Sequence, residues 1–193
     1  MMANLFGKEK PQQLSQREVL ASRYQGARHN LLLVVIFSLV NIFLLVTNSN
    51  TYFLFSATIP YFLVDMGMLL CGKYPEEYYL EFGGIDPVSD TFFIVMLVAA
   101  AVIILLYLLS WIFSKKPRVG WMIFALVFFV LDTVGMLCLT GITSDMIVDV
   151  VFHGWVIISL IGGVAAYFKA KKLPEEEDVP VVEAEQTPLE IEE

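Results

Sequence analysis

Residues 91–113 read TFFIVMLVAAAVIILLYLLSWIF, without a single charged side chain. An α-helix rises about 1.5 Å per residue, so a run of this length exceeds the roughly 30 Å thickness of a bilayer's hydrocarbon core. In that core every backbone N–H and C=O group needs a partner within the protein, and an α-helix satisfies these groups within one segment. The stretch therefore predicts a transmembrane helix.

The rest of the chain has the same apolar character. Of its 193 residues 58% are apolar, and the mean hydropathy is +0.71. These values exceed what a soluble core of this size needs. Further apolar runs cover residues 30–46, 119–140 and 146–168, and a fifth covers residues 52–71. The sequence predicts an all-α, polytopic transmembrane helix bundle that occupies residues 30–172.

The segment 52–71 decides between two topologies, because Pro60 and Asp65 interrupt its apolar run. Lys and Arg in short loops are retained on the cytoplasmic side of a membrane. If the segment does not cross, eleven of the twelve basic residues lie inside and only Lys73 lies outside; if it crosses, six lie on each side. We therefore expect four full spans, with 52–71 as a re-entrant or interfacial segment and both termini cytoplasmic at the plasma membrane. Five spans are the alternative, since about twenty residues suffice to cross.

A proline removes one backbone donor, so Pro60 is expected to break the helix near the middle of this segment into two half-helices. Irregular backbone at membrane depth is tolerated only where protein or water covers it. Residues 72–90 would then form an outer loop rich in acidic and aromatic side chains. An aromatic belt with solvated acids is favoured there, because the spacing of the acids matches no EF-hand.

Polar segments flank the apolar region. Residues 1–29 form a basic cytoplasmic leader, in which Ser15 and Glu18 have the spacing of a capping box. This predicts a short helix from Gln16 that lies on the membrane surface. The acid-rich residues 173–193 are expected to form a disordered cytoplasmic tail. No basic surface with interleaved aromatic residues is present for nucleic-acid binding.

Ionisable side chains cost about 3 kcal/mol to place in a membrane segment, so each is a candidate for function. The candidate polar intramembrane cluster consists of Asp65, Asp132, Asp149 and His153. Asp132 and His153 lie at similar distances from the turn around residues 141–144, roughly 15 Å below it, so they can meet. Asp149 and His153 are four residues apart, which places them on one helix face.

A carboxylate near an imidazole can form a structural pair, relay a proton or ion, or bind a transition metal. The structural pair is favoured, because DxxxH spacing is common by chance and no second His or Cys completes a zinc pattern. Cys71 and Cys138 both fall near the outer face in the four-span topology. Free thiols are the default for two cysteines, and a disulfide between them would support four spans.

Small residues in the last span, together with one Asn in the first, are interpreted as packing features within the monomer or a homo-oligomer. They are Asn41, Ser159, Gly162, Gly163 and Ala166. The common nucleotide, metalloprotease and esterase motifs are absent, so no cofactor is predicted and an enzyme is disfavoured without being excluded. We expect a non-enzymatic, partner-binding or structural membrane component. The alternatives are a small transporter or ion-coupled permease component that uses the polar cluster, and an intramembrane enzyme.

Four strings of the sequence carry a resemblance. They are NLLLVVIFSLVNIFLL from residue 30, TYFLFSATIPYFL from residue 51, PEEYY from residue 75 and KAKKLPEEE from residue 169. Together they resemble small multi-spanning membrane proteins of Gram-positive bacteria that carry no assigned activity. The resemblance implies a bacterial plasma-membrane location, and it implies no reaction, substrate or site.

Overall fold

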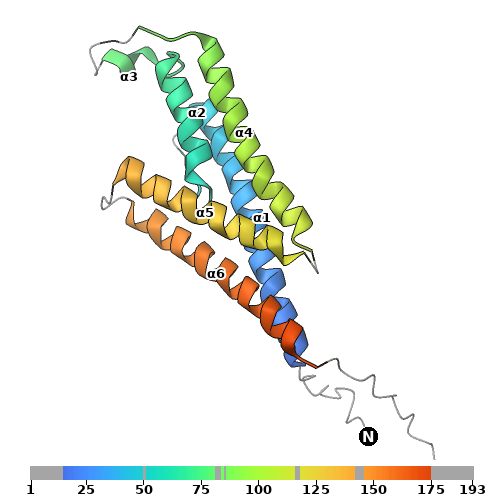
Figure 1. Ribbon diagram of the computed structural model, residues 1–193. Helices are drawn as coiled ribbons and strands as arrows, with labels where there is room; N and C mark the ends of the chain where they lie inside the picture. Colours follow the sequence, from blue (N-terminus) through green and yellow to red (C-terminus); the bar gives the residue numbers. More distant parts are fainter. Residues whose placement is uncertain are drawn as a thin grey trace, which may run out of the picture.

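The computed structural model describes residues 15–49, 51–80, 84, 86–115, 118–141 and 146–174. Within these residues the chain forms six α-helices, which confirms the predicted all-α bundle (Figure 1). The helices are α1 (Gln16–Val46), α2 (Thr58–Leu70), α3 (Glu76–Leu80), α4 (Asp90–Phe113), α5 (Val119–Thr140) and α6 (Ile147–Lys172). Four of them, α1, α4, α5 and α6, are long and apolar enough to cross a membrane, whereas the apolar α2 is shorter. The chain is thus a multi-pass membrane protein by its helix composition.

Helix α1 begins at the predicted capping box. The Ser15 hydroxyl accepts a hydrogen bond from the Glu18 N–H at 3.2 Å, and the Glu18 carboxylate accepts one from the Ser15 N–H at 2.7 Å. The helix then continues for 31 residues, about 46 Å. The separate surface helix expected before residue 30 is therefore wrong: residues 16–29 are the first part of α1, because buried side chains recur every three or four residues from Leu20 onward. Residues 1–14 of the expected leader and 175–193 of the expected tail lie outside the described residues.

Three parts of the chain meet toward the end of the bundle where α1 begins. The Arg17 guanidinium donates to the carbonyl oxygens of Leu173 at 3.2 Å and Pro174 at 2.8 Å, just past α6. Farther along α1, the guanidinium of the buried Arg28 donates to the Ser114 hydroxyl at 3.0 Å, just past α4. The start of α1, the end of α6 and the α4–α5 junction therefore lie on one side of the molecule (Figure 1). Four spans produce this arrangement.

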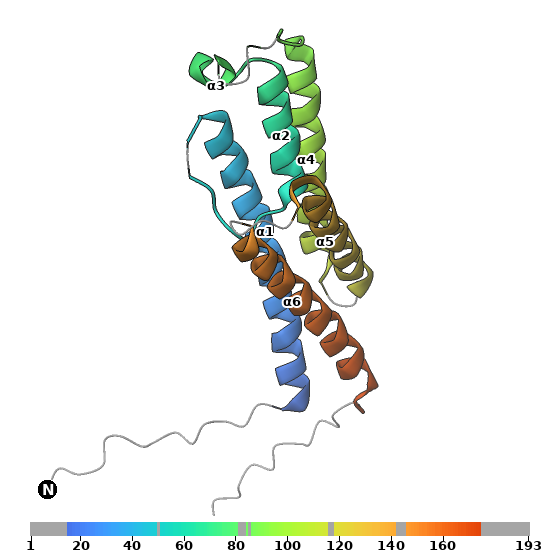
Figure 2. The ribbon, with the colours of Figure 1, turned by 90° about the vertical axis from the view of Figure 1, so that its left-hand side faces the viewer.

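Helix α2 does not run the length of the bundle. It has 13 residues and is about 20 Å long, short of the roughly 30 Å of a hydrocarbon core. Just before it, the Ala57 N–H donates to the Ser38 hydroxyl of α1 at 2.8 Å. Ser38 lies about 12 Å along α1 from its end at Val46. The chain therefore folds back from the end of α1 toward its middle and returns through α2, as a re-entrant segment does (Figure 2).

The expected pair of half-helices around Pro60 is wrong. Pro60 is the third residue of α2, and the residues that precede α2 are not helical. The first turn of a helix has no acceptor for its own N–H groups, so a proline without an N–H is tolerated there. The segment consequently contains one half-helix and one extended connection, and the proline lies at the boundary between them.

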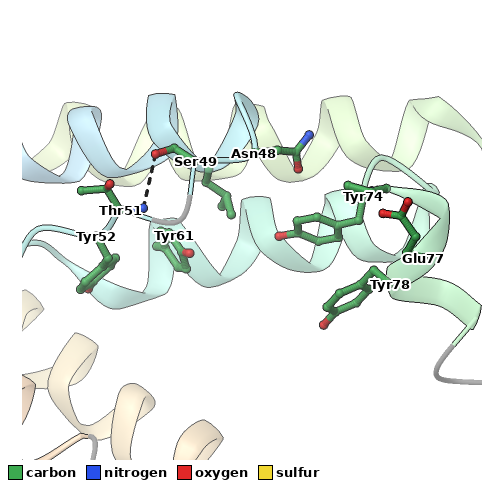
Figure 3. Close-up of a pocket in the computed structure, with 10 residues that line it drawn as sticks. Asn48, Ser49, Thr51, Tyr52, Tyr61, Tyr74, Glu77 and Tyr78 are labelled. Atoms are coloured by element: carbon green, nitrogen blue, oxygen red, sulfur yellow. Dashed lines mark hydrogen bonds between the residues drawn. The ribbon is translucent and has the colours of Figure 1, made fainter.

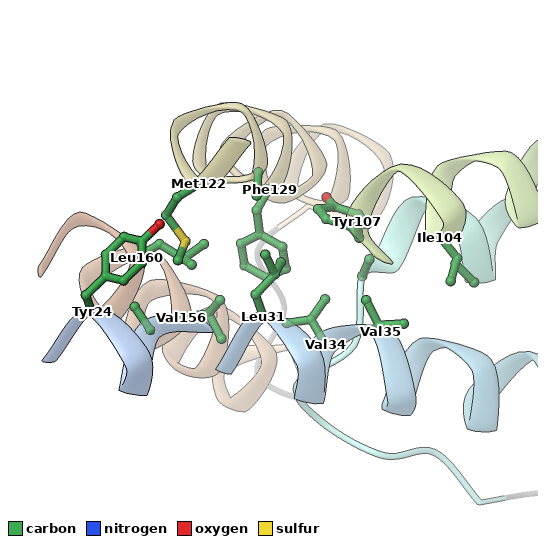
Figure 4. Close-up of a cluster of buried hydrophobic side chains, with 13 residues drawn as sticks. Tyr24, Leu31, Val34, Val35, Ile104, Tyr107, Met122, Phe129, Val156 and Leu160 are labelled. Atoms are coloured by element: carbon green, nitrogen blue, oxygen red, sulfur yellow. The ribbon is translucent and has the colours of Figure 1, made fainter. Parts of the chain in front are cut away.

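Side chains from α1, α4, α5 and α6 form the main core (Figure 4). Among its fully buried members are Leu31 of α1, Phe129 of α5 and Leu160 of α6. Where α1 and α6 cross, a Cβ placed on Gly163 would lie 2.4 Å from the Cβ of Ala27, so only glycine fits. The outward faces carry exposed apolar side chains, such as Leu39 at 54% exposure, which suits contact with lipid.

Candidate functional site

Asp132 of α5 binds the start of the re-entrant helix α2. Its side chain is nearly fully buried, at 4% exposure. Oδ2 accepts a hydrogen bond from the Thr58 N–H and Oδ1 accepts one from the Ile59 N–H, each at 2.9 Å. Charge-assisted bonds of this kind are stronger than neutral ones, and the N-terminus of a helix carries partial positive charge. The backbone of α2 thus supplies the compensation that a buried carboxylate requires.

All four N–H positions at the start of α2 are accounted for. A helix leaves the N–H groups of its N-cap and first three residues without partners inside the helix. Here the N-cap is Ala57, whose N–H donates to the Ser38 hydroxyl at 2.8 Å. Thr58 and Ile59 donate to Asp132, and Pro60 has no N–H. A helix therefore begins at membrane depth without an unpaired donor, which hydrocarbon would penalise by several kcal/mol.

Asn41 of α1 holds the extended connection that leads to α2. Its amide nitrogen donates to the Phe53 carbonyl at 2.7 Å and to the Ser56 hydroxyl at 2.8 Å, while its oxygen accepts from the Phe53 N–H at 2.8 Å. The hydroxyls of Tyr52 and Ser56 lie 2.9 Å apart and share a further hydrogen bond. Protein groups thus cover the irregular backbone, as expected for a re-entrant segment.

The connection also contains a strained residue. Phe55 has a φ of 69°, in the left-handed region that bulky side chains rarely adopt. Its ring packs against two aromatic rings of α6, with centroid distances of 4.2 Å to Phe152 and 5.1 Å to Trp155. Such conformations persist where surrounding contacts fix them. The position of the connection is therefore set by α6 as well as by α1.

His153 of α6 lies beside Asp132, as its depth in the sequence suggested. Its Nδ1 is 2.9 Å from the carbonyl oxygen of Asp149, which only accepts hydrogen bonds, so Nδ1 carries a hydrogen. Its Nε2 lies 3.4 Å from the Thr58 hydroxyl and 3.6 Å from Oδ2 of Asp132. In the neutral form Nε2 accepts from Thr58; a second proton on Nε2 would create an ion pair with Asp132.

Asp149 and Asp65 lie apart from this pair. The Asp149 backbone carbonyl, rather than its carboxylate, contacts His153. Both carboxylates are half-buried and line a hollow of about 290 Å³ between α2, α5 and α6, together with Thr58. The four residues of the predicted cluster are thus arranged as two sets, Asp132 with His153 and Asp65 with Asp149, and Thr58 borders both.

Asp65 has a specific partner in Tyr74, which follows α2. The Tyr74 hydroxyl donates to Oδ1 of Asp65. Desolvation raises the pKa of the Tyr74 hydroxyl, and the hydrogen bond to the Asp65 carboxylate raises it further, because both favour the neutral phenol. This contact links the end of α2 to the polypeptide that leads into α3.

A larger hollow opens at the same end of the molecule, next to α3 (Figure 3). We call it the outer hollow; its volume is about 460 Å³. It is lined by Leu45, Asn48, Ser49, Thr51, Tyr52, Tyr61, Tyr74, Pro75, Glu77 and Tyr78. The lining is therefore mostly polar and aromatic, and a carboxylate is its only charged group among the described residues.

The acidic loop contains one ion pair in its described part. The Lys73 ammonium lies 2.7 Å from Oδ1 of Asp90, and both side chains are well exposed. The hydrogen bond to Asp90 raises the pKa of Lys73. Among the described residues no group of three His, Cys, Asp or Glu side chains is arranged to hold a metal ion. The acid Glu81 and the aromatic Phe82 of the expected belt lie outside those residues.

Both cysteines are free thiols. The buried Cys71 lies just past α2 and donates from Sγ to the Ser89 carbonyl at 3.3 Å, whereas Cys138 is exposed on α5. Of the small residues predicted to pack, Gly163 and Ala166 are buried in the α1–α6 crossing and Ser159 accepts a hydrogen bond from Asn30 at 2.6 Å. Gly162 is exposed, and a methyl group added there would meet nothing within 4 Å, so Gly162 has no packing role within the monomer.

Sequence reasoning missed the role of hydroxyl groups. Ser38 resembles any small residue of an apolar run, yet it caps α2. The Tyr107 hydroxyl of α4 is buried without a hydrogen-bond partner among the described residues, and it lines a hollow of about 180 Å³ with Asp132. No spacing in the sequence reveals either position, because both depend on how separate helices pack together.

The chain is therefore a membrane-spanning helical protein with four candidate spans, a short re-entrant helix and surface hollows beside that helix. Its buried polar residues are concentrated where the re-entrant segment meets α1, α5 and α6. Comparison of the chain with family models, with curated proteins and with solved structures finds no match.

Proposed function

We propose that the protein is a non-enzymatic membrane component that binds a ligand or partner at the end of the bundle formed by the re-entrant segment. The supporting observation is that three buried polar side chains beside the re-entrant segment are already used by the fold. Ser38, Asn41 and Asp132 each bind backbone groups of the re-entrant segment. The outer hollow and the hollow lined by Asp65 and Asp149 flank that segment, so these interactions hold their walls in place.

The arrangement around His153 argues against intramembrane catalysis by a hydroxyl nucleophile. In such sites one imidazole nitrogen faces the nucleophile and the other is oriented by a carboxylate. Here the Thr58 hydroxyl and the Asp132 carboxylate both face Nε2, and Nδ1 faces a backbone carbonyl. Asp132 also binds two N–H groups of α2, so its position is fixed by the backbone of α2 rather than by the imidazole. An enzymatic role is therefore disfavoured.

The proposal also includes the orientation of the protein in the membrane. Arg17, Arg28, Lys115 and the lysines at the end of α6 lie on the side where α1 begins. Basic residues of short loops stay on the cytoplasmic side. We therefore place both termini in the cytoplasm and both hollows outside a bacterial plasma membrane. A membrane-protein partner or a second copy of the chain is the macromolecular alternative to a small ligand.

A second candidate function is ion-coupled transport, which one observation favours. Asp65 and Asp149 line the same hollow next to a half-helix, and transporters place carboxylates and broken helices at their substrate sites. Asp132 and His153 lie beyond Thr58, at the inner side of that hollow. A pathway for protons or cations would have to pass these residues.

Flux measurements separate the two functions. The purified chain is reconstituted into proteoliposomes with an internal pH dye, and proton flux is measured under gradients of pH and of Na⁺. For a binding component we expect no flux above that of empty vesicles, and no change in the variants Asp65→Asn, Asp149→Asn and His153→Ala. Cation-driven flux that Asp65→Asn or Asp149→Asn abolishes would replace the binding proposal with transport.

A further inference from the structure

We propose that the outer hollow binds a small organic ammonium ion, either a protonated amine or a quaternary ammonium. The inference rests on the proposed function and names the class of ligand that this function would involve. The volume of the outer hollow, about 460 Å³, lies within the range of roughly 300–1,000 Å³ that small-molecule sites occupy. The composition of its wall indicates the chemistry of the occupant.

Four tyrosines line the outer hollow, and contacts between them fix their rings (Figure 3). Tyr52 and Tyr61 meet edge to face with centroids 5.2 Å apart, and Tyr74 and Tyr78 meet at 5.1 Å. The Tyr52 hydroxyl is paired with Ser56 and the Tyr74 hydroxyl with Asp65. At least two of the four hydroxyls are thus used by the fold, and the rings are held as an aromatic lining. Rings of this kind attract ammonium groups through their electron-rich faces.

Charge around the outer hollow also favours a cation. Glu77 contributes a carboxylate to its wall, and no lysine or arginine among the described residues lines it. Asp65 accepts a hydrogen bond from the Tyr74 hydroxyl, which increases the electron density of that ring. The nearby Lys73 is neutralised by its ion pair with Asp90. An anionic ligand would meet a carboxylate without a compensating base.

The same wall is poorly suited to a metal ion. Ca²⁺ needs six to eight oxygen ligands, usually from several carboxylates and carbonyls. Of the acidic residues described by the structure, only Glu77 lines this hollow. An ammonium ion needs fewer polar groups, because aromatic faces and a single carboxylate satisfy it. The aromatic rings would have little use in a calcium site.

Choline and its neutral isostere 3,3-dimethylbutan-1-ol provide the test, because they share shape and differ in charge. Binding to the full-length protein is measured by isothermal titration in nanodiscs of phosphatidylglycerol, which has no ammonium group. We expect saturable binding of choline and about tenfold weaker binding of the neutral alcohol. Equal binding of the two would overturn the proposal.

Two substitutions in α3 form a matched pair. Glu77→Gln removes the carboxylate of the outer hollow and should weaken choline binding about fivefold. Glu76→Gln removes the same charge from an exposed neighbour that lines a different hollow, and choline binding should be unchanged. Equal effects of the two variants would show that only the general field of the loop matters and would overturn the site. Unchanged thermal unfolding of both variants verifies that they fold.

The aromatic contribution is tested at Tyr78. Tyr78→Leu should weaken choline binding about fivefold, whereas Tyr78→Phe, which keeps the ring, should bind as the original chain does. Equal affinities of the two variants would show that the ring of Tyr78 does not contribute to choline binding. Repeating the titration in phosphatidylcholine nanodiscs distinguishes the ligand source: if a lipid headgroup occupies the site, the apparent affinity for free choline falls. Absence of choline binding in both bilayers overturns this inference and leaves the proposed function, which flux measurements test, unaffected.

Discussion

A charged side chain is tolerated at membrane depth only where neighbouring groups compensate its charge. At Asp132 these groups are backbone N–H groups of α2. Its two oxygens accept from two successive N–H groups of α2. The geometry requires an acceptor on both oxygens, which an ionised carboxylate provides and an amide does not. The fold therefore requires a carboxylate at position 132, and the stability of the re-entrant segment depends on that side chain.

We predict that Asp132→Asn destabilises the protein by about 1–3 kcal/mol. The amide nitrogen of Asn would face one of the N–H groups of Thr58 or Ile59, leaving that donor unpaired in an apolar environment. Asp149→Asn is the matched control, because no hydrogen bond to the Asp149 carboxylate is found among the described residues; its effect should stay within about 0.5 kcal/mol. Thermal unfolding in detergent compares the two variants. Equal stability losses would refute the capping role of Asp132.

Tyr74 gives a prediction about pH. Its pKa is raised in the folded protein above the ordinary value of 10.0, chiefly by desolvation and then by the hydrogen bond to Asp65. A raised pKa means that the folded state holds the proton more tightly, so the contribution to stability is complete below about pH 10 and declines as the pH rises above it. Tyr74→Phe lacks both the hydrogen bond and the titration. The difference in melting temperature between the original chain and Tyr74→Phe should therefore shrink as the pH rises above about 10, and a constant difference would contradict this.

At the scale of helices, the close crossing of α1 and α6 depends on the absence of a side chain at Gly163. The buried residues of α6 recur every three or four positions and end in this crossing. Close approach lets the backbones of two membrane helices pack directly, which is the main source of association where lipid removes the hydrophobic driving force. The crossing also brings the ends of α1 and α6 together, where Arg17 binds the residues after α6.

Gly163→Ala should destabilise the bundle by about 1–3 kcal/mol, because its methyl group would lie 2.4 Å from the Cβ of Ala27 and force the helices apart. Gly162→Ala is the neighbouring control. A methyl group at Gly162 meets nothing within 4 Å, so no loss of stability is expected there. Chemical denaturation of the two variants in the same detergent measures the difference. A similar loss at both positions would rule out the contact with Ala27 as its cause, because helix propensity by itself favours alanine over glycine.

The sequence predicts the long helices well because lipid imposes length and polarity on a span. The run 91–113 corresponds to α4 and the run 119–140 to α5. The re-entrant segment was recognised from the distribution of Lys and Arg, yet its internal structure was not, because Pro60 is compatible with either a break or a helix start. Within the candidate site, depth along the chain predicts that Asp132 and His153 meet. The contact of Asp65 with Tyr74 depends on the turn after α2, and the shared hollow of Asp65 and Asp149 depends on how α2, α5 and α6 pack.

At the scale of the whole molecule, charge is segregated between the two ends of the bundle. Lys73 is the only basic residue between Arg28 and Lys115 apart from His29, and it is paired with Asp90. The outer hollow and α3 lie at the end where α2 finishes, and the basic residues other than Lys73 lie toward the end where α1 begins. One topology therefore determines which compartment can supply a ligand to either hollow.

Single cysteines in a background lacking Cys71 and Cys138 test that topology. In the four-span arrangement, a membrane-impermeant maleimide added to intact cells should label Lys73→Cys, whereas Lys115→Cys and Glu193→Cys should be labelled only after permeabilisation. Lys73 and Lys115 lie in loops at opposite ends of α4, so their accessibilities must differ whichever way the protein is inserted. Which of the two cysteine variants is labelled from outside the cell therefore shows the orientation of the protein. If Lys115→Cys were labelled from outside and Lys73→Cys were protected, both hollows would face the cytoplasm, and an ammonium ligand would have to come from inside the cell.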